Sequence, residues 1–273
     1  MPARTDHAIV LRLVDYSETS QIASLFTAEN GLVRLIAKGL RRNTRNRVSV
    51  GLDLLEYGEI GFVAARGDAG LGTLTEWMQR DAFPRLRTSL ARLYGGLYAV
   101  ELVNTLTQEY DPHPGLFEAL LAMLREMTAD PPAVIAVARF QARLAREIGY
   151  FPRLDACVIC QRPRPPRTET FFSAGAGGVV CRDCEANVVE KRSIPAGLLD
   201  PPPRTPAARD ATQPPSPSDP TPRAAAVASL RSSGDDVDPR RALEWFRLLN
   251  YHLTYIAGRP FETAAPAERW LSQ

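Results

Sequence analysis

QIASLFTAENGLVRLIA, residues 21–37, consists of two apolar runs on either side of Asn30-Gly31. Asn and Gly tolerate the positive φ that a primed β-turn requires, so this dipeptide between apolar runs is a strong hairpin signal. The sequence therefore predicts a β-hairpin formed by residues 21–27 and 31–37.

Three further runs with strand character surround this hairpin. They read AIVLRL at 8–13, LLEYGEIGFVA at 54–64 and LGTLTEW at 71–77, and glycines mark turns at 38–39 and 67–70. Five short strands are too few for an immunoglobulin sandwich and suit a small closed barrel such as the five-stranded OB type. We therefore expect an OB-type β-barrel over residues 1–80.

After residue 80 the apolar spacing changes to that of helices. Leu86, Leu90, Leu93, Leu97 and Val100 recur every three or four residues, which predicts one face of a helix.

Three more helices are expected beyond it. One covers 113–128, one runs from Asp130-Pro131 to Gly149, and one runs from Asp238-Pro239 to Gly258. Asp is a good N-cap, Pro suits the first turn, and Gly ends helices. The core positions expected on these helices are Phe117, Leu120, Leu121, Leu124, Met127, Val137, Phe140, Leu144, Ile148, Leu243, Phe246, Leu249, Leu253 and Ile256. Residues 81–153 and 237–260 thus form a predicted helical domain, and the fold class is α+β.

Residues 200–223 read DPPPRTPAARDATQPPSPSDPTPR and contain no apolar side chain larger than Ala. Such a segment cannot bury enough surface to offset its ordering entropy. We expect a Pro-rich disordered insertion over 200–236.

All four cysteines lie in one short region, as Cys157-Val-Ile-Cys160 and Cys181-Arg-Asp-Cys184. Two CxxC pairs supply the four tetrahedral thiolates that Zn²⁺ prefers, and a complete shell leaves no open position for catalysis. The sequence predicts one structural zinc in an inserted four-cysteine, zinc-ribbon-like module over 154–192. Phe171, Phe172 and the glycines at 175–178 favour a short hairpin between the pairs. Disulfides or reduced thiols would be the alternative in a secreted chain.

Cations near the cysteines are expected to offset the formal −2 of four thiolates on Zn²⁺. They are Arg162, Arg164, Arg167, Arg182, Lys191 and Arg192.

The formal net charge is only +2, but the charge is unevenly distributed. No acidic residue lies between Glu29 and Asp53, and six cations do. These candidate nucleic-acid-binding residues are Arg34, Lys38, Arg41, Arg42, Arg45 and Arg47. Guanidinium groups pair with phosphate oxygens, so a barrel carrying them suits single-stranded nucleic acid, although a merely solvated loop has the same composition.

Several classes of protein are disfavoured. Hydrophobic residues make up 45% and charged residues 23%, as in soluble globular proteins. No apolar run approaches the roughly 20 residues that span a bilayer, and the first residues do not form a signal peptide, so we expect a cytoplasmic protein. GxSxG, a P-loop and a dinucleotide fingerprint are missing, and the three histidines stand apart, so no catalytic residue is assigned.

The order of these parts resembles the RecO recombination-mediator family. The resemblance is carried by YSETS at 16–20, LFTAENGLVRLIAKGLRR at 25–42, GTLTE at 72–76, GYFPRLDACVIC at 149–160 and NYHL at 250–253. It implies an N-terminal OB-fold, a helical domain and a zinc module. It also implies binding of single- and double-stranded DNA, strand annealing, contact with RecR and with the C-terminal tail of single-strand binding protein, and indirect action on RecA. The family has no known catalytic residue.

The tail of single-strand binding protein is acidic and apolar, so it would suit a cationic rim around an apolar pocket. Arg139, Arg143 and Arg146 on the expected third helix are the candidates.

Two alternatives to a DNA-binding mediator stay open. One is a zinc-ribbon scaffold that binds only proteins. The other is a metal-dependent nuclease, which would need a cluster of acidic residues that the sequence does not single out.

Overall fold

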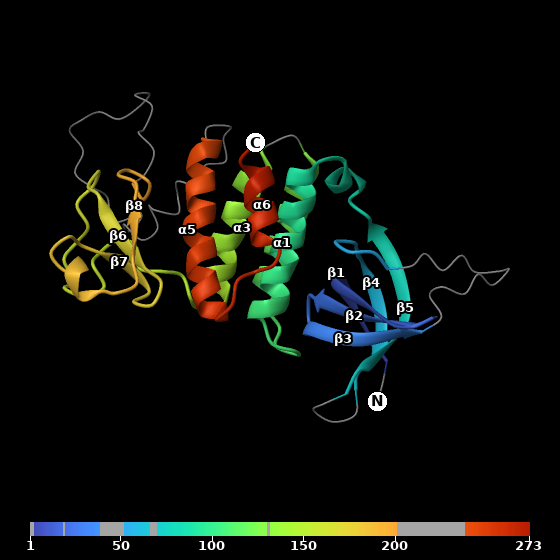
Figure 1. Cartoon of the computed structure of the whole chain (residues 1–273). Helices are drawn as coiled ribbons and strands as arrows, with labels where there is room; N and C mark the ends of the chain where they lie inside the picture. The colour runs from blue at the N-terminus through green and yellow to red at the C-terminus, as the bar shows by residue number, and fades with distance from the viewer. Residues whose placement is uncertain (1–2, 19, 39–51, 66–69, 130–131, 201–237) are drawn as a thin grey trace, which may run out of the picture.

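A computed structural model describes residues 3–18, 20–38, 52–65, 70–129, 132–200 and 238–273. A β-barrel lies at one end of the molecule, helices form the middle, and a small sheet beside the cysteines lies at the other end (Figure 1). None of the helices in these ranges is long and apolar enough to cross a bilayer.

The barrel confirms the predicted five strands. They are β1 (Arg4–Ser17), β2 (Ser20–Thr27), β3 (Gly31–Lys38), β4 (Tyr57–Val63) and β5 (Gly72–Asp81). They close in the order β1-β2-β3-β5-β4, and only the β3–β5 pair is parallel. The expected strand at 54–64 begins only at Tyr57, because Leu55 has a φ of 68° and breaks the extended run.

The β2–β3 hairpin is present, but its turn differs from the expected one. Thr27 pairs with Gly31, so three residues connect the strands, and only Gly31 has positive φ. Asp6 holds the turn, because its carboxylate accepts from the backbone N–H of Glu29 and from the backbone N–H and side-chain amide of Asn30. The Asn-Gly signal thus predicted the hairpin correctly, but Asn30 does not have the positive φ of a primed turn.

Six helices, one of them a short 3₁₀ turn, form the middle of the molecule in the described ranges. They are η1 (Pro84–Thr88), α1 (Leu90–Leu106), α2 (Pro114–Thr128), α3 (Ala133–Glu147), α5 (Pro239–Ala257) and α6 (Ala264–Leu271). The expected core residues of α2, α3 and α5 are buried or packed against the core. Gly149 and Gly258 follow α3 and α5 with positive φ, and Asp238 caps α5 through the Arg240 N–H. Asp130, the expected cap of α3, lies outside the described residues.

The expected face of the first helix is correct in part, since Val100 is buried and Leu93 and Leu97 pack against the core. However, Leu86 belongs to the separate 3₁₀ turn, and Leu90 is exposed. Buried residues lie on more than one side of α1, and they include Gly95, Gly96 and Tyr98. The reason is that α1 lies between the barrel and the helices α3 and α6, so it has no single solvent face. The helix α6 was not foreseen.

Two hydrophobic cores hold the described parts of the chain together. One fills the barrel, with Val10, Leu25, Leu35 and Phe62 at its centre. The other runs without a break from the outer side of the barrel through the helices to the small sheet. That sheet contains β6 (Thr170–Ser173), β7 (Gly178–Val180) and β8 (Arg192–Ile194), in the order β7-β6-β8. The hairpin expected between the cysteine pairs is confirmed, and β8 was not predicted.

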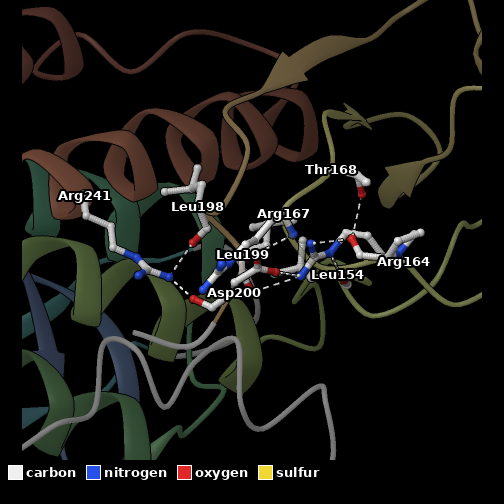
Figure 2. A network of polar contacts seen from close by, with 9 residues as sticks. Leu154, Arg164, Arg167, Thr168, Leu198, Leu199, Asp200 and Arg241 are labelled. Atoms are coloured by element: carbon white, nitrogen blue, oxygen red, sulfur yellow. Dashed lines mark hydrogen bonds and ion pairs between the residues drawn. The ribbon is translucent and has the colours of Figure 1, made fainter. Parts of the chain in front are cut away.

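The expected disordered insertion does not begin at residue 200. Asp200 is buried and accepts from Arg164 Nη2 at 2.7 Å and from the Arg167 backbone N–H at 2.7 Å (Figure 2). Arg241, on the first turn of α5, donates to the carbonyl groups of Leu198 and Asp200. The two flanks of the Pro-rich segment therefore meet at one point, and 201–236 lie outside the described residues.

Candidate metal centre and nucleic-acid interface

The cysteine cluster is built by two turns that face each other. Cys157 and Cys160 lie in a turn after α3, Cys181 directly follows β7, and Cys184 precedes the 3₁₀ turn η2 (Glu185–Asn187). The four Sγ atoms lie within 4.8 Å of one another, and Cys160 Sγ is 3.7 Å from Cys181 Sγ. A Zn–S bond of about 2.3 Å in a tetrahedron places sulfurs about 3.8 Å apart, whereas a disulfide needs about 2.05 Å. The residues can therefore hold a metal ion, and none of the four is in a disulfide.

The thiols influence one another strongly. Burial opposes ionisation of Cys157, but the backbone N–H groups of Cys160, Cys181 and Ile159 outweigh it and lower its pKa to about 6. The hydrogen bond with Cys181, together with burial, raises the pKa of Cys184 to about 12. Four adjacent thiolates thus repel one another unless a cation lies between them, and metal binding would release the remaining protons.

The expected offset of thiolate charge by six cations is mostly wrong. Arg162 lies close enough that, after its hydrogen bond with Asp183, the charges of Cys160 and Cys181 raise its pKa. Four others have side chains engaged elsewhere: Arg164 with Asp200, Arg182 with Glu169, Lys191 with the Glu185 carbonyl, and Arg192 over the Tyr251 ring. Arg167 contacts Asp200 through its backbone N–H. Cations that are close to the cysteines in sequence therefore need not point their side chains toward the thiolates.

The centre is fixed to the helices by an aromatic contact around His252 on α5. Its Nε2 lies 2.7 Å from the Tyr150 carbonyl oxygen, so Nε2 carries the proton that is donated. Phe172 of β6 packs edge-on against the imidazole at 5.5 Å between ring centroids. Burial lowers the pKa of His252. This histidine is a packing residue of the core.

Two of the six expected nucleic-acid-binding cations lie in the described residues. Arg34 and Lys38 are exposed on β3, and Arg34 Nε pairs with Glu109 Oε1 at 3.1 Å. Lys38 is the last described residue of the strand. Arg41, Arg42, Arg45 and Arg47 lie outside the described residues.

The three arginines expected to hold an acidic tail are on α3. Arg139 pairs with Glu126 at 2.8 Å, Arg143 pairs with Glu147 at 2.8 Å, and Arg146 lies over the Phe151 ring at 4.2 Å. An acidic ligand would compete with these carboxylates.

Fold and site together define a class of protein, with an OB-type barrel, a helical body and four cysteines that can hold a metal ion. Residues 1–83 match the family model described as "Recombination protein O N terminal", and residues 87–204 match "Recombination protein O C terminal". The chain belongs to the RecO family of DNA repair proteins.

Three relatives illustrate the similarity, and each bears the name DNA repair protein RecO. The protein of Rhodopirellula baltica is 36% identical over 178 residues, which is 65% of each chain. That of Anaeromyxobacter sp. strain K is 36% identical over 194 residues, 70% of this chain and 74% of the relative. That of Myxococcus xanthus is 30% identical over 199 residues, 71% of this chain and 78% of the relative.

Proposed function

We propose that this chain is a non-enzymatic DNA repair protein that binds single- and double-stranded DNA and anneals complementary strands. In this role it helps RecR and RecA replace single-strand binding protein during recombinational repair, in the cytoplasm at the nucleoid. Family membership supports the repair role, and three relatives carry the name of a DNA repair protein.

The exposed cations of β3 are the observation that carries DNA binding. Arg34 and Lys38 lie on the same side of the strand, and the sequence continues from Lys38 into Arg41, Arg42, Arg45 and Arg47 without an acidic residue. Arginine and lysine neutralise phosphates regardless of base sequence. Residues 1–80 are thus the proposed DNA-binding domain.

The four cysteines are the proposed ligands of one structural Zn²⁺. Bound there, the ion would cross-link the two turns and balance their thiolates. Residues 154–192 then form a metal-stabilised module, and 81–153 with 237–260 form the helical domain that carries it. Arg139, Arg143 and Arg146 are the proposed contacts for the tail of single-strand binding protein.

The test is a triple variant in which Arg41, Arg42 and Arg45 become Ala. Each lost phosphate contact removes about 0.7 from the slope of log affinity against log salt on single strands, so the slope should flatten by about two. Affinity should fall similarly for every oligonucleotide sequence. Fluorescence anisotropy at several salt concentrations measures both, with zinc content and thermal unfolding as controls.

An unchanged affinity and slope would move the DNA site away from these arginines. If the wild-type chain binds no oligonucleotide even at low salt, the protein-binding scaffold becomes the better function. The cleft of ≈ 420 Å³ beside Cys157, Pro163 and Val179 would be its first candidate surface. Cleavage of DNA with added Mg²⁺ would instead indicate a nuclease.

A further inference from the structure

The cysteine sulfurs of the metal centre are not equally shielded from solvent. Cys157 is buried, whereas Cys160 and Cys181 are partly exposed. The cleft of ≈ 420 Å³ adjoins the cluster, and Cys157 and Cys181 are among the residues that line it. A small solute can therefore approach the cluster in the folded protein, and Cys181 is the lining cysteine that is partly exposed.

The two partly exposed cysteines contact each other across the cluster. Cys160 belongs to the first turn and Cys181 to the second, and their Sγ atoms are 3.7 Å apart. A disulfide needs about 2.05 Å, so a small approach of the two turns would allow the sulfurs to bond. The buried Cys157 sulfur instead accepts from the Cys181 backbone N–H at 3.4 Å, which holds it inside the cluster.

The strand β7 connects this pair to the helical part of the molecule. Cys181 directly follows β7, and in the first turn the Val158 N–H donates to the Val179 carbonyl at 2.9 Å. The neighbouring strand β6 pairs with β7 and carries Phe172, which packs against His252 of α5. A movement that brings the two turns together therefore changes how the small sheet packs on α5.

We propose that Cys160 and Cys181 form a peroxide-sensitive switch, which a hydroperoxide converts to a disulfide across the two turns. Two of the four ligands are lost in this reaction, and the two thiols that remain are too few for a closed tetrahedral site. The oxidised module no longer holds a metal ion, and its contact with α5 loosens. This response to an oxidant is independent of DNA binding by the barrel.

The reaction balances with one hydroperoxide as the oxidant. The Cys181 thiolate attacks a peroxide oxygen from the cleft: an S–O bond forms, the O–O bond breaks, and hydroxide or alkoxide leaves and takes a proton from water. The Cys160 thiolate then attacks the sulfur of the sulfenic acid. The S–S bond forms, the S–O bond breaks, and hydroxide leaves and is protonated to water. The two sulfurs lose two electrons, and the peroxide gains them.

The experiment treats the reduced, zinc-loaded chain with hydrogen peroxide and follows free zinc with a chelating dye. We expect release of about one zinc per chain, because one closed site binds one ion. Peptide mapping without reductant should find the Cys160–Cys181 disulfide, and dithiothreitol should reverse it. Hydrogen exchange of the oxidised chain should show weaker protection in α5 and unchanged protection in β1, β2 and β3.

Cys160→Ser and Cys184→Ser are matched variants, since each removes one of the four possible ligands. Cys184→Ser keeps the pair and should form the disulfide as the wild-type chain does, whereas Cys160→Ser should not form an intramolecular disulfide. Both are oxidised without metal as well, so that weaker metal binding does not determine the result.

Three outcomes would overturn the proposal. They are an equal yield of intramolecular disulfide in both variants, a disulfide within either CxxC turn of the wild-type chain, and zinc that stays bound while peroxide oxidises the exposed Met78. A chain purified without zinc would still test the pair through its disulfide and through the exchange of α5. The salt titration of DNA binding tests the proposed function separately.

Discussion

Asp200 has a buried carboxylate with a donor on each oxygen, Arg164 Nη2 on Oδ1 and the Arg167 backbone N–H on Oδ2. Its side chain is 13% exposed, that of Arg164 is 12% exposed, and Arg241 binds the Asp200 carbonyl from α5. Burial acts to raise the pKa of Asp200, but the hydrogen bonds from Arg164 and from the Arg167 backbone outweigh it and hold the pKa below its ordinary value. The ion pair joins Arg164 of the cysteine module to residue 200, and the hydrogen bonds of Arg241 join that segment to α5 (Figure 2).

Asp200→Asn should destabilise the protein by about 2–3 kcal/mol, because it leaves Arg164 buried without its partner. Since the native pKa is lowered, the stabilisation is complete above the ordinary pKa of 3.8 and is lost as the pH falls through the lower native value. The difference between variant and wild type in urea unfolding should therefore be constant near neutral pH and shrink below about pH 4.

Glu59→Gln provides the control for this change. Glu59 pairs with Arg80 on the barrel, but both side chains are well exposed, so the loss should stay below about 1 kcal/mol. If Asp200→Asn loses no more unfolding free energy than Glu59→Gln does, the buried ion pair contributes little to stability.

The helix α1 shows how neighbouring elements determine which residues of a helix are buried and how closely it packs. It has two consecutive glycines, which would weaken an isolated helix, yet both are buried. A Cβ on Gly95 would meet Val137 Cγ2 of α3 at 2.9 Å, and one on Gly96 would meet Leu55 Cδ1 at 3.0 Å. The glycines allow α1 to pack closely on α3 and on the turn before β4.

Gly95→Leu should destabilise the protein by about 2 kcal/mol or more, because the side chain has no space between α1 and α3. Gly115→Ala in the first turn of α2 is the control. The atoms nearest to its Cβ would be those of the flexible Glu147 carboxylate, at 2.9 Å, so the stability of this variant should change by less than about 1 kcal/mol. Thermal and urea unfolding would measure both, and equal stability of the two variants would contradict the tight contact.

The whole molecule places its two chemical surfaces at opposite ends of the helices (Figure 1). The cysteine module shares its core with the helices, since Phe172, Val179 and Ile194 belong to the same cluster as Trp245. The barrel has a separate core of its own. Unfolding that starts at the cysteine cluster should therefore spread into α5 before it reaches the barrel.

Removal of the metal with a chelator should test this coupling by hydrogen exchange. We expect about one zinc per chain before treatment, and afterwards loss of amide protection in 154–194 and weaker protection in α5. Amides of β1, β2 and β3 should keep their protection. Loss of protection in the barrel at the same rate would show that the molecule unfolds as one unit.

The sequence by itself determined the features that depend on neighbouring residues. Asn30-Gly31 specified a hairpin, Asp238-Pro239 and Gly258 bounded α5, and two CxxC pairs placed four thiols together, because backbone conformation and ligand spacing act over a few residues. The family resemblance was carried by motifs of this kind. The cation cluster predicted Arg34 and Lys38 as part of a candidate DNA surface, and their role stays a prediction, although both are exposed on β3.

Only the tertiary structure decided what depends on distant partners. The burial of α1 on several sides follows from the barrel and α3, which are distant from it in sequence. The sequence predicts Asp200 as the first residue of a disordered Pro-rich segment, whereas in the structure Arg164 and Arg241 bind it. Leu11 of β1 is buried in the core shared with the helices, whereas Val14 and Tyr16 farther along the same strand are exposed. Whether a residue is buried, ion-paired or exposed depends on the residues that pack against it in space. Local sequence patterns do not identify those neighbours.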